Sequence, residues 1–182
     1  MSLVKRVAAV VLAATTVGAV ATAAPAQAGI VQFWEQFEST NHGSWWTGGG
    51  AGFDYQKGLA HKGVGNAWIR ATSGWNSINT TVGVYPNADC VASAWIRLSD
   101  HLDPGYMSVR SWNGKDAGPV INEIKLVGPG PVNEANSNYN QYVFHFNPGN
   151  AQNVLFYVGM WGNGKDAWAQ IDDVVIQCPT PH

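Results

Sequence analysis

The chain has 182 residues, and only 12% of them are Asp, Glu, Lys or Arg, against roughly 25% in typical soluble domains. Hydrophobic residues make up 46% and nine tryptophans are present, which excludes a disordered chain. The formal net charge is −2 with no run of basic residues, which argues against nucleic acid and anionic membranes as partners.

The first 28 residues have the features of a secretory signal peptide. Lys5 and Arg6 form a short positive region, an Ala- and Val-rich stretch runs from Val7 to Ala24, and Ala26-Gln27-Ala28 is an A-x-A cleavage signal. We therefore expect a secreted, extracellular protein whose mature part, 29–182, is a single domain and a monomer. Without Lys5 and Arg6 this part carries eight basic and twelve acidic side chains, which favours a neutral partner.

Strand signals recur along the mature chain, and no segment has a good helical pattern. In chain order we expect strands at 30–38, 64–71 and 75–84, a turn at Pro86-Asn87, and further strands at 89–98, 105–112, 142–146, 153–161 and 168–177. In 89–98, small and aliphatic residues alternate with Ser93, Trp95 and Arg97, which is the pattern of a half-buried strand. In 105–112, Met107 and Val109 are expected to point inward.

A short sequence repeat marks two predicted turns. Asn113-Gly114-Lys115-Asp116-Ala117 recurs as Asn163-Gly164-Lys165-Asp166-Ala167, and each copy follows a segment with a Trp at its end. Asn-Gly is the strongest dipeptide signal for a hairpin turn. Some ten short strands and 21 glycines predict an all-β fold, a jelly-roll β-sandwich of two antiparallel sheets.

Two cysteines, Cys90 and Cys178, remain in a chain that is expected to reach an oxidising compartment. We predict that they form a disulfide, which would close a loop of 88 residues and stabilise the fold by about 4 kcal/mol in the chain-entropy model. The alternative is a pair of buried free thiols.

Four segments together resemble a known family: Phe37-Glu38-Ser39 with a Trp near residue 45, then 65–70 (GNAWIR), 93–97 (SAWIR) and 170–174 (QIDDV). They are similar to bacterial carbohydrate-binding modules of the jelly-roll, galactose-binding-like type, which accompany secreted cellulases, xylanases and chitinases. The resemblance covers nearly the whole mature chain. It implies a binding domain for an extracellular polysaccharide or oligosaccharide, although the catalytic domain that such modules normally accompany is missing from this sequence.

Outward-facing aromatic residues fit this implication. The apolar face of a pyranose ring packs on an indole or phenol ring, while its hydroxyl groups need polar partners. Strand alternation places a large set of aromatic and arginine side chains outward, and two further tryptophans lie in Gly-bounded loops. The candidate ligand-binding residues are Trp95, Arg97, Tyr106, Arg110, Trp112, Tyr157 and Trp161, with Trp46 and Trp75 at the rim.

The same resemblance implies a structural calcium ion, held by acidic residues of the first and last strands. Its candidate ligands are Glu38 and Asp172, with Asp173 as an alternative or additional ligand. The other possibility is that these are ordinary carboxylates without a metal.

No catalytic motif is recognisable in the sequence, which leaves an enzyme as the second hypothesis. Of the twelve acidic residues, Glu123 in Ile121-Asn122-Glu123-Ile124 is the best candidate for a buried strand, but no second acid stands out as its partner. The alternatives to a non-catalytic binding domain are therefore a small polysaccharide hydrolase or lyase, and an interaction protein of the cell surface.

Overall fold

The computed structural model describes residues 30–99, 104–127 and 139–179, and the predicted signal peptide lies outside them. In the described part of the chain, every secondary-structure element is a β-strand. They are β1 (Ile30–Glu35), β2 (Trp45–Thr47), β3 (Ala51–Asp54), β4 (Asn66–Gly83), β5 (Cys90–Leu98), β6 (Gly105–Trp112), β7 (Ala117–Leu126), β8 (Asn140–Phe146) and β9 (Asn153–Pro179).

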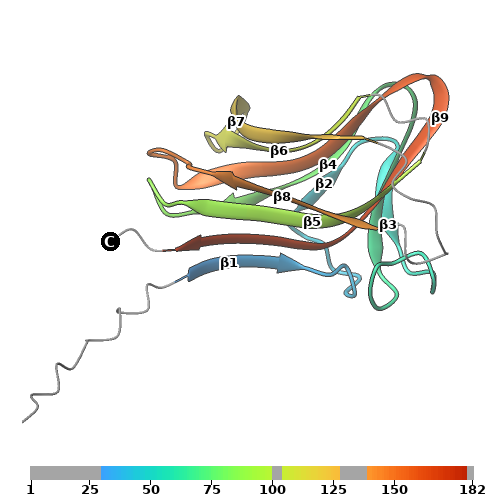
Figure 1. Ribbon diagram of the computed structural model, residues 1–182, viewed down its shortest axis with the longest axis horizontal. Helices are drawn as coiled ribbons and strands as arrows, with labels where there is room; N and C mark the ends of the chain where they lie inside the picture. The colour runs from blue at the N-terminus through green and yellow to red at the C-terminus, as the bar shows by residue number, and fades with distance from the viewer. Residues whose placement is uncertain (1–29, 100–103, 128–138, 180–182) are drawn as a thin grey trace, which may run out of the picture.

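Two long strands, β4 and β9, pair with each other over almost their full length and pass through both layers of the molecule (Figure 1). Their outer parts, 66–71 and 167–179, pair with β1, β3 and β5, and β5 pairs with β8; we call this the β5 layer. Their other parts, 73–83 and 153–163, pair with β2 and β6, and β6 pairs with β7; we call this the β6 layer. All pairs are antiparallel, which confirms the predicted jelly-roll sandwich.

A bend carries β4 and β9 from one layer to the other. Their register shifts between Ala71 and Ser73, opposite the Asn163–Asp166 segment of β9, which contains two extra residues. Gly162 is required at this bend, because a Cβ atom there would collide with the backbone of Thr72 and Ser73. The second copy of the repeated sequence is therefore a bulge inside one strand, whereas the first copy is the turn between β6 and β7.

The predicted strands differ from the observed ones in number. The segments 64–71 and 75–84 form the single strand β4, and the segments 153–161 and 168–177 form the single strand β9, since hydrogen bonding continues through the bend. The strands β2 and β3 were not expected, and β7 is longer than the Ile121-Asn122-Glu123-Ile124 segment that was expected as a strand. The first two are short and lie beside the Gly48–Gly50 run, and two register shifts break the alternation of β7.

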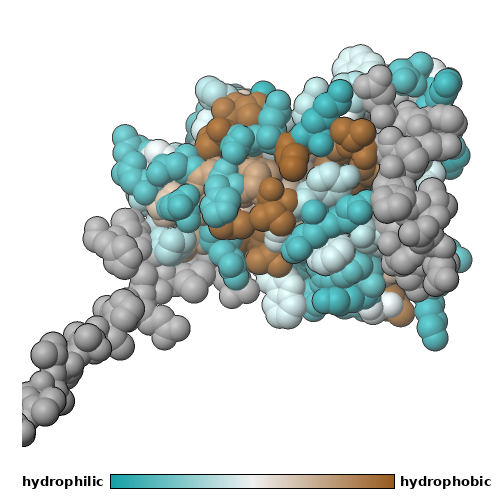
Figure 2. All heavy atoms as spheres, viewed as in Figure 1, coloured by the Kyte–Doolittle hydropathy of each residue, from teal (hydrophilic) through white to brown (hydrophobic). Residues whose placement is uncertain are grey.

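The core lies between the two layers and is built by the alternating residues. In β5, Ala92, Ala94 and Ile96 are fully buried, and in β6 so are Met107 and Val109, as predicted. Phe156 and Val158 of β9 fill the β6 side of the same core. Outside it, hydrophobic side chains gather near the middle of the face seen in Figure 2 and hydrophilic ones surround them.

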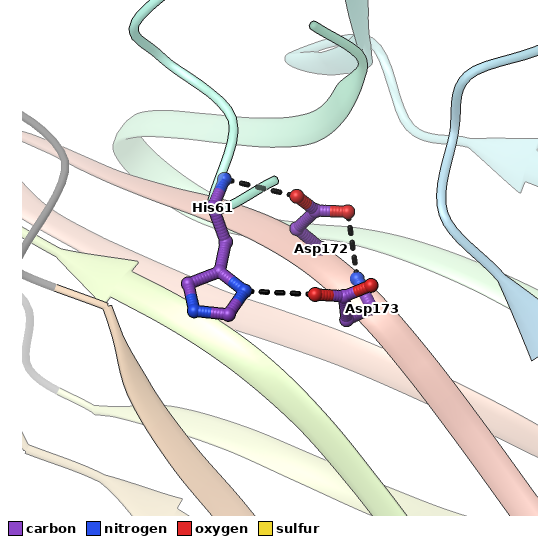
Figure 3. Close-up of side chains that lie close together, drawn as sticks. All are labelled: His61, Asp172 and Asp173. Carbon is purple, nitrogen blue, oxygen red and sulfur yellow. Dashed lines mark hydrogen bonds and ion pairs between the residues drawn. The ribbon is translucent and has the colours of Figure 1, made fainter. Parts of the chain in front are cut away.

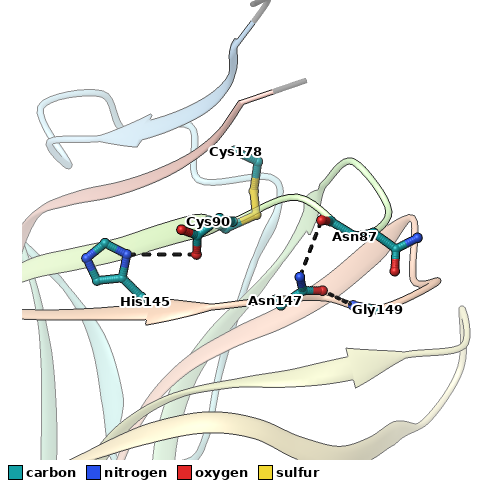
Figure 4. The surroundings of a disulfide bond; sticks show 7 residues. Asn87, Cys90, His145, Asn147, Gly149 and Cys178 are labelled. Carbon is teal, nitrogen blue, oxygen red and sulfur yellow. Dashed lines mark hydrogen bonds and ion pairs between the residues drawn. A yellow bond between two sulfur atoms is a disulfide. The ribbon is translucent and has the colours of Figure 1, made fainter. Parts of the chain in front are cut away.

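The predicted disulfide between Cys90 and Cys178 is present (Figure 4). It joins the first residue of β5 to the end of β9, and β1 pairs with β9 up to Pro179. The last strand is therefore covalently held in the β5 layer. In the described part of the chain, no helix is long and apolar enough to cross a membrane.

Candidate functional site

Seven of the nine candidate ligand-binding residues lie on one surface, the outer face of the β6 layer. The pairings of β2, β4, β9 and β6 place them at outward positions of neighbouring strands. Trp46, Trp75 and Trp161 are exposed, and the other four are half-buried. We call this surface the β6 face; the seven are Trp46, Trp75, Tyr106, Arg110, Trp112, Tyr157 and Trp161.

A hollow of about 140 Å³ lies in the β6 face, with Tyr157 among its lining residues. The Trp75 ring lies edge-on to the Tyr157 ring, with 6.2 Å between their centroids, and Arg110 Cζ lies 5.9 Å from the Tyr157 centroid. Polar groups come from Ser77 and Asn79, which share the parity of Trp75 in β4. That shared parity in the sequence could have identified both residues. The lining is completed by Leu155.

One polar atom in this hollow lacks a partner. Arg110 Nε is buried and makes no hydrogen bond among the described residues. A buried N–H donor without an acceptor is costly, by about 1–3 kcal/mol. The site therefore holds a donor that a bound oxygen atom can satisfy.

Two further features shape the aromatic surface. The rings of Trp46 and Trp112, from β2 and β6, lie 5.6 Å apart between centroids. The Trp75 ring packs over Gly159, where a Cβ atom would collide with the indole. The platform thus depends on a residue without a side chain beneath it.

Trp95 and Arg97 do not belong to the β6 face. Both lie on β5, on the outer side of the other layer, so the nine candidates do not form one surface. Strand parity distinguishes inward from outward residues but does not say which layer a strand joins. Arg97 lies over Trp168, 5.3 Å from its ring centroid.

Two adjacent acidic residues of β9, Asp172 and Asp173, lie beside His61 (Figure 3). A β-bulge, in which Asp172 and Val175 pair with Trp95 and Ser93, inserts one extra residue in β9, and Asp173 has a positive φ of 46°. Both aspartates are consequently buried on the same side. Their carboxylates and the imidazole of His61 have ligand atoms within 4.8 Å of one another.

Hydrogen bonds hold this cluster together. Asp172 accepts hydrogen bonds from the backbone N–H groups of His61, Lys62 and Asp173, at 2.9, 3.0 and 2.7 Å. Burial raises the pKa of Asp172 to about 6, against the opposing effect of these donors. Asp173 lies 2.7 Å from His61 Nδ1 and accepts a hydrogen bond from Gln36 Nε2 at 3.1 Å.

Glu38 does not belong to this cluster of ligand atoms. It binds the loop between β3 and β4, which also contains His61 and Lys62. It accepts hydrogen bonds from the N–H groups of Val64 and Gly65, two to four residues after those that Asp172 binds. Asn66, the first residue of β4, is fully buried, and its Oδ1 has no hydrogen-bond partner among the described residues. It precedes Ala67, which pairs with Ile171, the neighbour of Asp172. Carboxylate and amide oxygens are ligands that Ca²⁺ takes, so this donor set fits the ion in kind.

Glu123 is not a buried acid. It is exposed on β7, at an outward position opposite Ser108. The sequence predicts a buried strand here, but β7 pairs with β6 and shows no second partner strand among the described residues.

No protein-family model matches the sequence, and a search of curated proteins finds no match. Solved structures share the fold. The CBM22-1 xylan-binding domain of Paenibacillus barcinonensis Xyn10C has a TM-score of 0.57 and 16% identity, covering 87% of this chain and 100% of that one. TmCBM61 in complex with β-1,4-galactotriose has a TM-score of 0.55 and 15% identity, covering 78% and 93%. The K1 cleaved adhesin domain of Lys-gingipain from Porphyromonas gingivalis W83 has a TM-score of 0.56 and 14% identity, covering 83% and 99%.

Proposed function

We propose that this protein is a secreted, non-catalytic domain that binds an extracellular polysaccharide through the β6 face. Two of the similar folds are a xylan-binding domain and a module in complex with a galactotriose, which supports a glycan as the ligand class. The signal peptide expected from the sequence and the Cys90–Cys178 bond are consistent with export.

One observation carries this proposal: Arg110 Nε, beside the Tyr157 and Trp75 rings, has no hydrogen-bond partner in the part of the chain that the structure describes. A sugar can bind to both features at once, because its C–H face packs on an aromatic ring and its hydroxyl oxygens accept a hydrogen bond from an N–H donor. In the bound state, Arg110 donates to a hydroxyl oxygen while Tyr157 and Trp75 contact the ring. Ser77 and Asn79 supply further hydrogen bonds from the same hollow.

Calcium is part of the proposal as a structural ion. Asp172, Asp173 and the Oδ1 of Asn66 would hold it. Glu38, from the segment between β1 and β2, would bind the loop between β3 and β4 from its other side, and the bound ion would fix this loop against β9. This loop does not line the β6-face hollow, so we expect the ion to act on stability and not on the sugar contacts.

Binding to insoluble cellulose, xylan, chitin and galactan, followed by titration with oligosaccharides of the polymer that binds, tests the proposal. Arg110→Gln should lower the affinity at least tenfold with an unchanged melting temperature. Arg70→Gln is the matched control, because Arg70 is an exposed arginine that pairs with Asp166 on the other layer. Wild-type affinity in Arg110→Gln would refute the assigned site.

An assay of reducing-sugar release on the same polymers separates binding from hydrolysis. We expect no release by the wild type. Release that disappears in Glu123→Gln would instead establish the hydrolase alternative.

A further inference from the structure

We propose that the outer face of the β5 layer carries a second, separate binding site for a neutral glycan. The proposal takes its ligand class from the proposed function but rests on different residues. The site is a hollow of about 300 Å³, a volume at the small end of the range for ligand pockets. We call it the β5 hollow; its lining includes Trp34, Gln36, Ser93, Trp95, Gln141 and Gln177.

The first argument is the exposure of Trp34. It lies on β1 opposite Val175, and 61% of its surface is exposed, more than that of any other aromatic residue among the exposed large hydrophobics described. Its neighbour Phe33 is half-buried and packs against the core. An indole so exposed adds little to folding and is free to contact a ligand.

The second argument is that Trp95 is held in a fixed orientation. The His61 ring stacks on its indole, with 4.0 Å between centroids and 12° between planes. His61 is in turn fixed by Asp173, 2.7 Å from its Nδ1. His61 stacks on the indole but is not among the residues that line the β5 hollow, whereas Trp95 is. An aromatic ring that is already ordered loses little entropy when it binds.

The third argument is the polar lining, which is rich in uncharged groups. Three glutamine amides and the Ser93 hydroxyl can each donate and accept hydrogen bonds, as sugar hydroxyls do. Gln36 is positioned by its hydrogen bond to Asp173. Lys62 and Asp173 also line the hollow, and their charges compensate each other, because Lys62 Nζ lies 3.9 Å from Asp173 Oδ2. Neutral hydroxyls therefore fit this hollow better than an anion or a cation.

The two sites lie on opposite outer faces of the sandwich, so one chain would hold two glycan strands at once. Such a bivalent protein binds a polymer surface more tightly than either site alone and can bridge separate strands.

The test follows the indole N–H signals in ¹⁵N NMR spectra while xylohexaose, cellohexaose, chitohexaose and β-1,4-galactotriose are titrated in turn. With a glycan that binds, we expect the Trp34 and Trp75 signals to follow two separate binding curves. Trp75→Ala should keep the Trp34 curve. Trp34→Ala should keep the Trp75 curve and weaken binding in the β5 hollow, followed at the Trp95 signal, at least tenfold. Val143→Ala is the control, since this exposed residue lies opposite Ser93 and outside the lining.

The outcomes separate the two proposals. If Trp75→Ala abolishes all binding and no glycan shifts the Trp34 or Trp95 signals, the second site is refuted and the β6 face stands. If Trp34→Ala abolishes all binding and the Trp75 signal never moves, the β5 hollow stands and the β6 face is refuted. If no glycan moves any indole signal of the wild type, both sites are refuted.

Discussion

Tyr157→Ala and Phe156→Ala form a matched pair that tests the β6 face, because adjacent residues of one strand point to opposite sides. Tyr157 is half-buried in the outer hollow, beside Trp75 and Arg110. Removal of a central aromatic residue from a binding site costs about 2 kcal/mol of binding free energy, which corresponds to about a 30-fold weaker affinity. The fold should lose little stability, since the core beneath remains intact.

Phe156→Ala should have the opposite effect. Its ring is fully buried and lies edge-on to Trp45, 6.3 Å away between centroids. Truncation of a buried Phe lowers the free energy of unfolding by about 3–5 kcal/mol, which for a domain of this size lowers the melting temperature by roughly 6–20 °C. The affinity of the molecules that remain folded should change far less than in Tyr157→Ala.

Both variants are assayed by calorimetric melting and by oligosaccharide titration at a temperature where each is folded. Separate effects, on affinity in one variant and on stability in the other, are the expected result. If Tyr157→Ala unfolds as readily as Phe156→Ala, the ring serves packing. If Tyr157→Ala binds every glycan as tightly as the wild type, the β6 face is not the site.

Three further predictions follow from single features. Gly159→Ala should weaken glycan binding, because the added methyl group displaces the Trp75 ring. Gly83→Ala is the control and should leave the affinity unchanged, since the added carbon meets only Asn153, at 3.9 Å. Equal affinities of the two variants in a titration would contradict the role of the Trp75 platform. Chelation by EDTA should lower the melting temperature, since Ca²⁺ at ~100 times its dissociation constant adds about 2.7 kcal/mol to the free energy of unfolding. Asn66→Ala should reduce the difference in melting temperature with and without EDTA. A melting temperature insensitive to EDTA would argue against the ion. Cys90→Ser with Cys178→Ser should cost about 4 kcal/mol of stability in the chain-entropy model, measured by urea unfolding, and an unchanged midpoint would show that the bond does not stabilise the last strand.

The sequence allowed much of the core to be predicted, because alternation is a local property. The inward positions of Met107, Val109, Phe156 and Ile96 could be read from neighbouring residues alone, and all four are buried. The disulfide could be predicted from compartment and number of cysteines. Short strands such as β2 leave no such pattern, since three residues cannot show a period.

The acidic cluster shows where local patterns fail. In a regular strand Asp172 and Asp173 would point to opposite faces, and the bulge in β9 places both against the 61–65 loop. His61, which completes this cluster, lies more than a hundred residues earlier in the chain. No spacing in the sequence relates His61 to the aspartates, because the pairing of β4 with β9 and the hydrogen bonds of the loop before β4 bring them together.

The division of the aromatic residues between two faces has the same origin. Trp68 and Trp75 are seven residues apart in β4, so in a flat strand they would point to opposite sides of one sheet and one of them would enter the core. The bend at Ala71–Ser73 moves the strand from one layer to the other between them, and in a sandwich the outer sides of the two layers face opposite ways. Both tryptophans thus remain outside the core, and Trp161 and Trp168 repeat the arrangement on β9. The segment that looks in the sequence like a break between two strands is therefore the bend that gives each of the two central strands an outward aromatic residue on both faces.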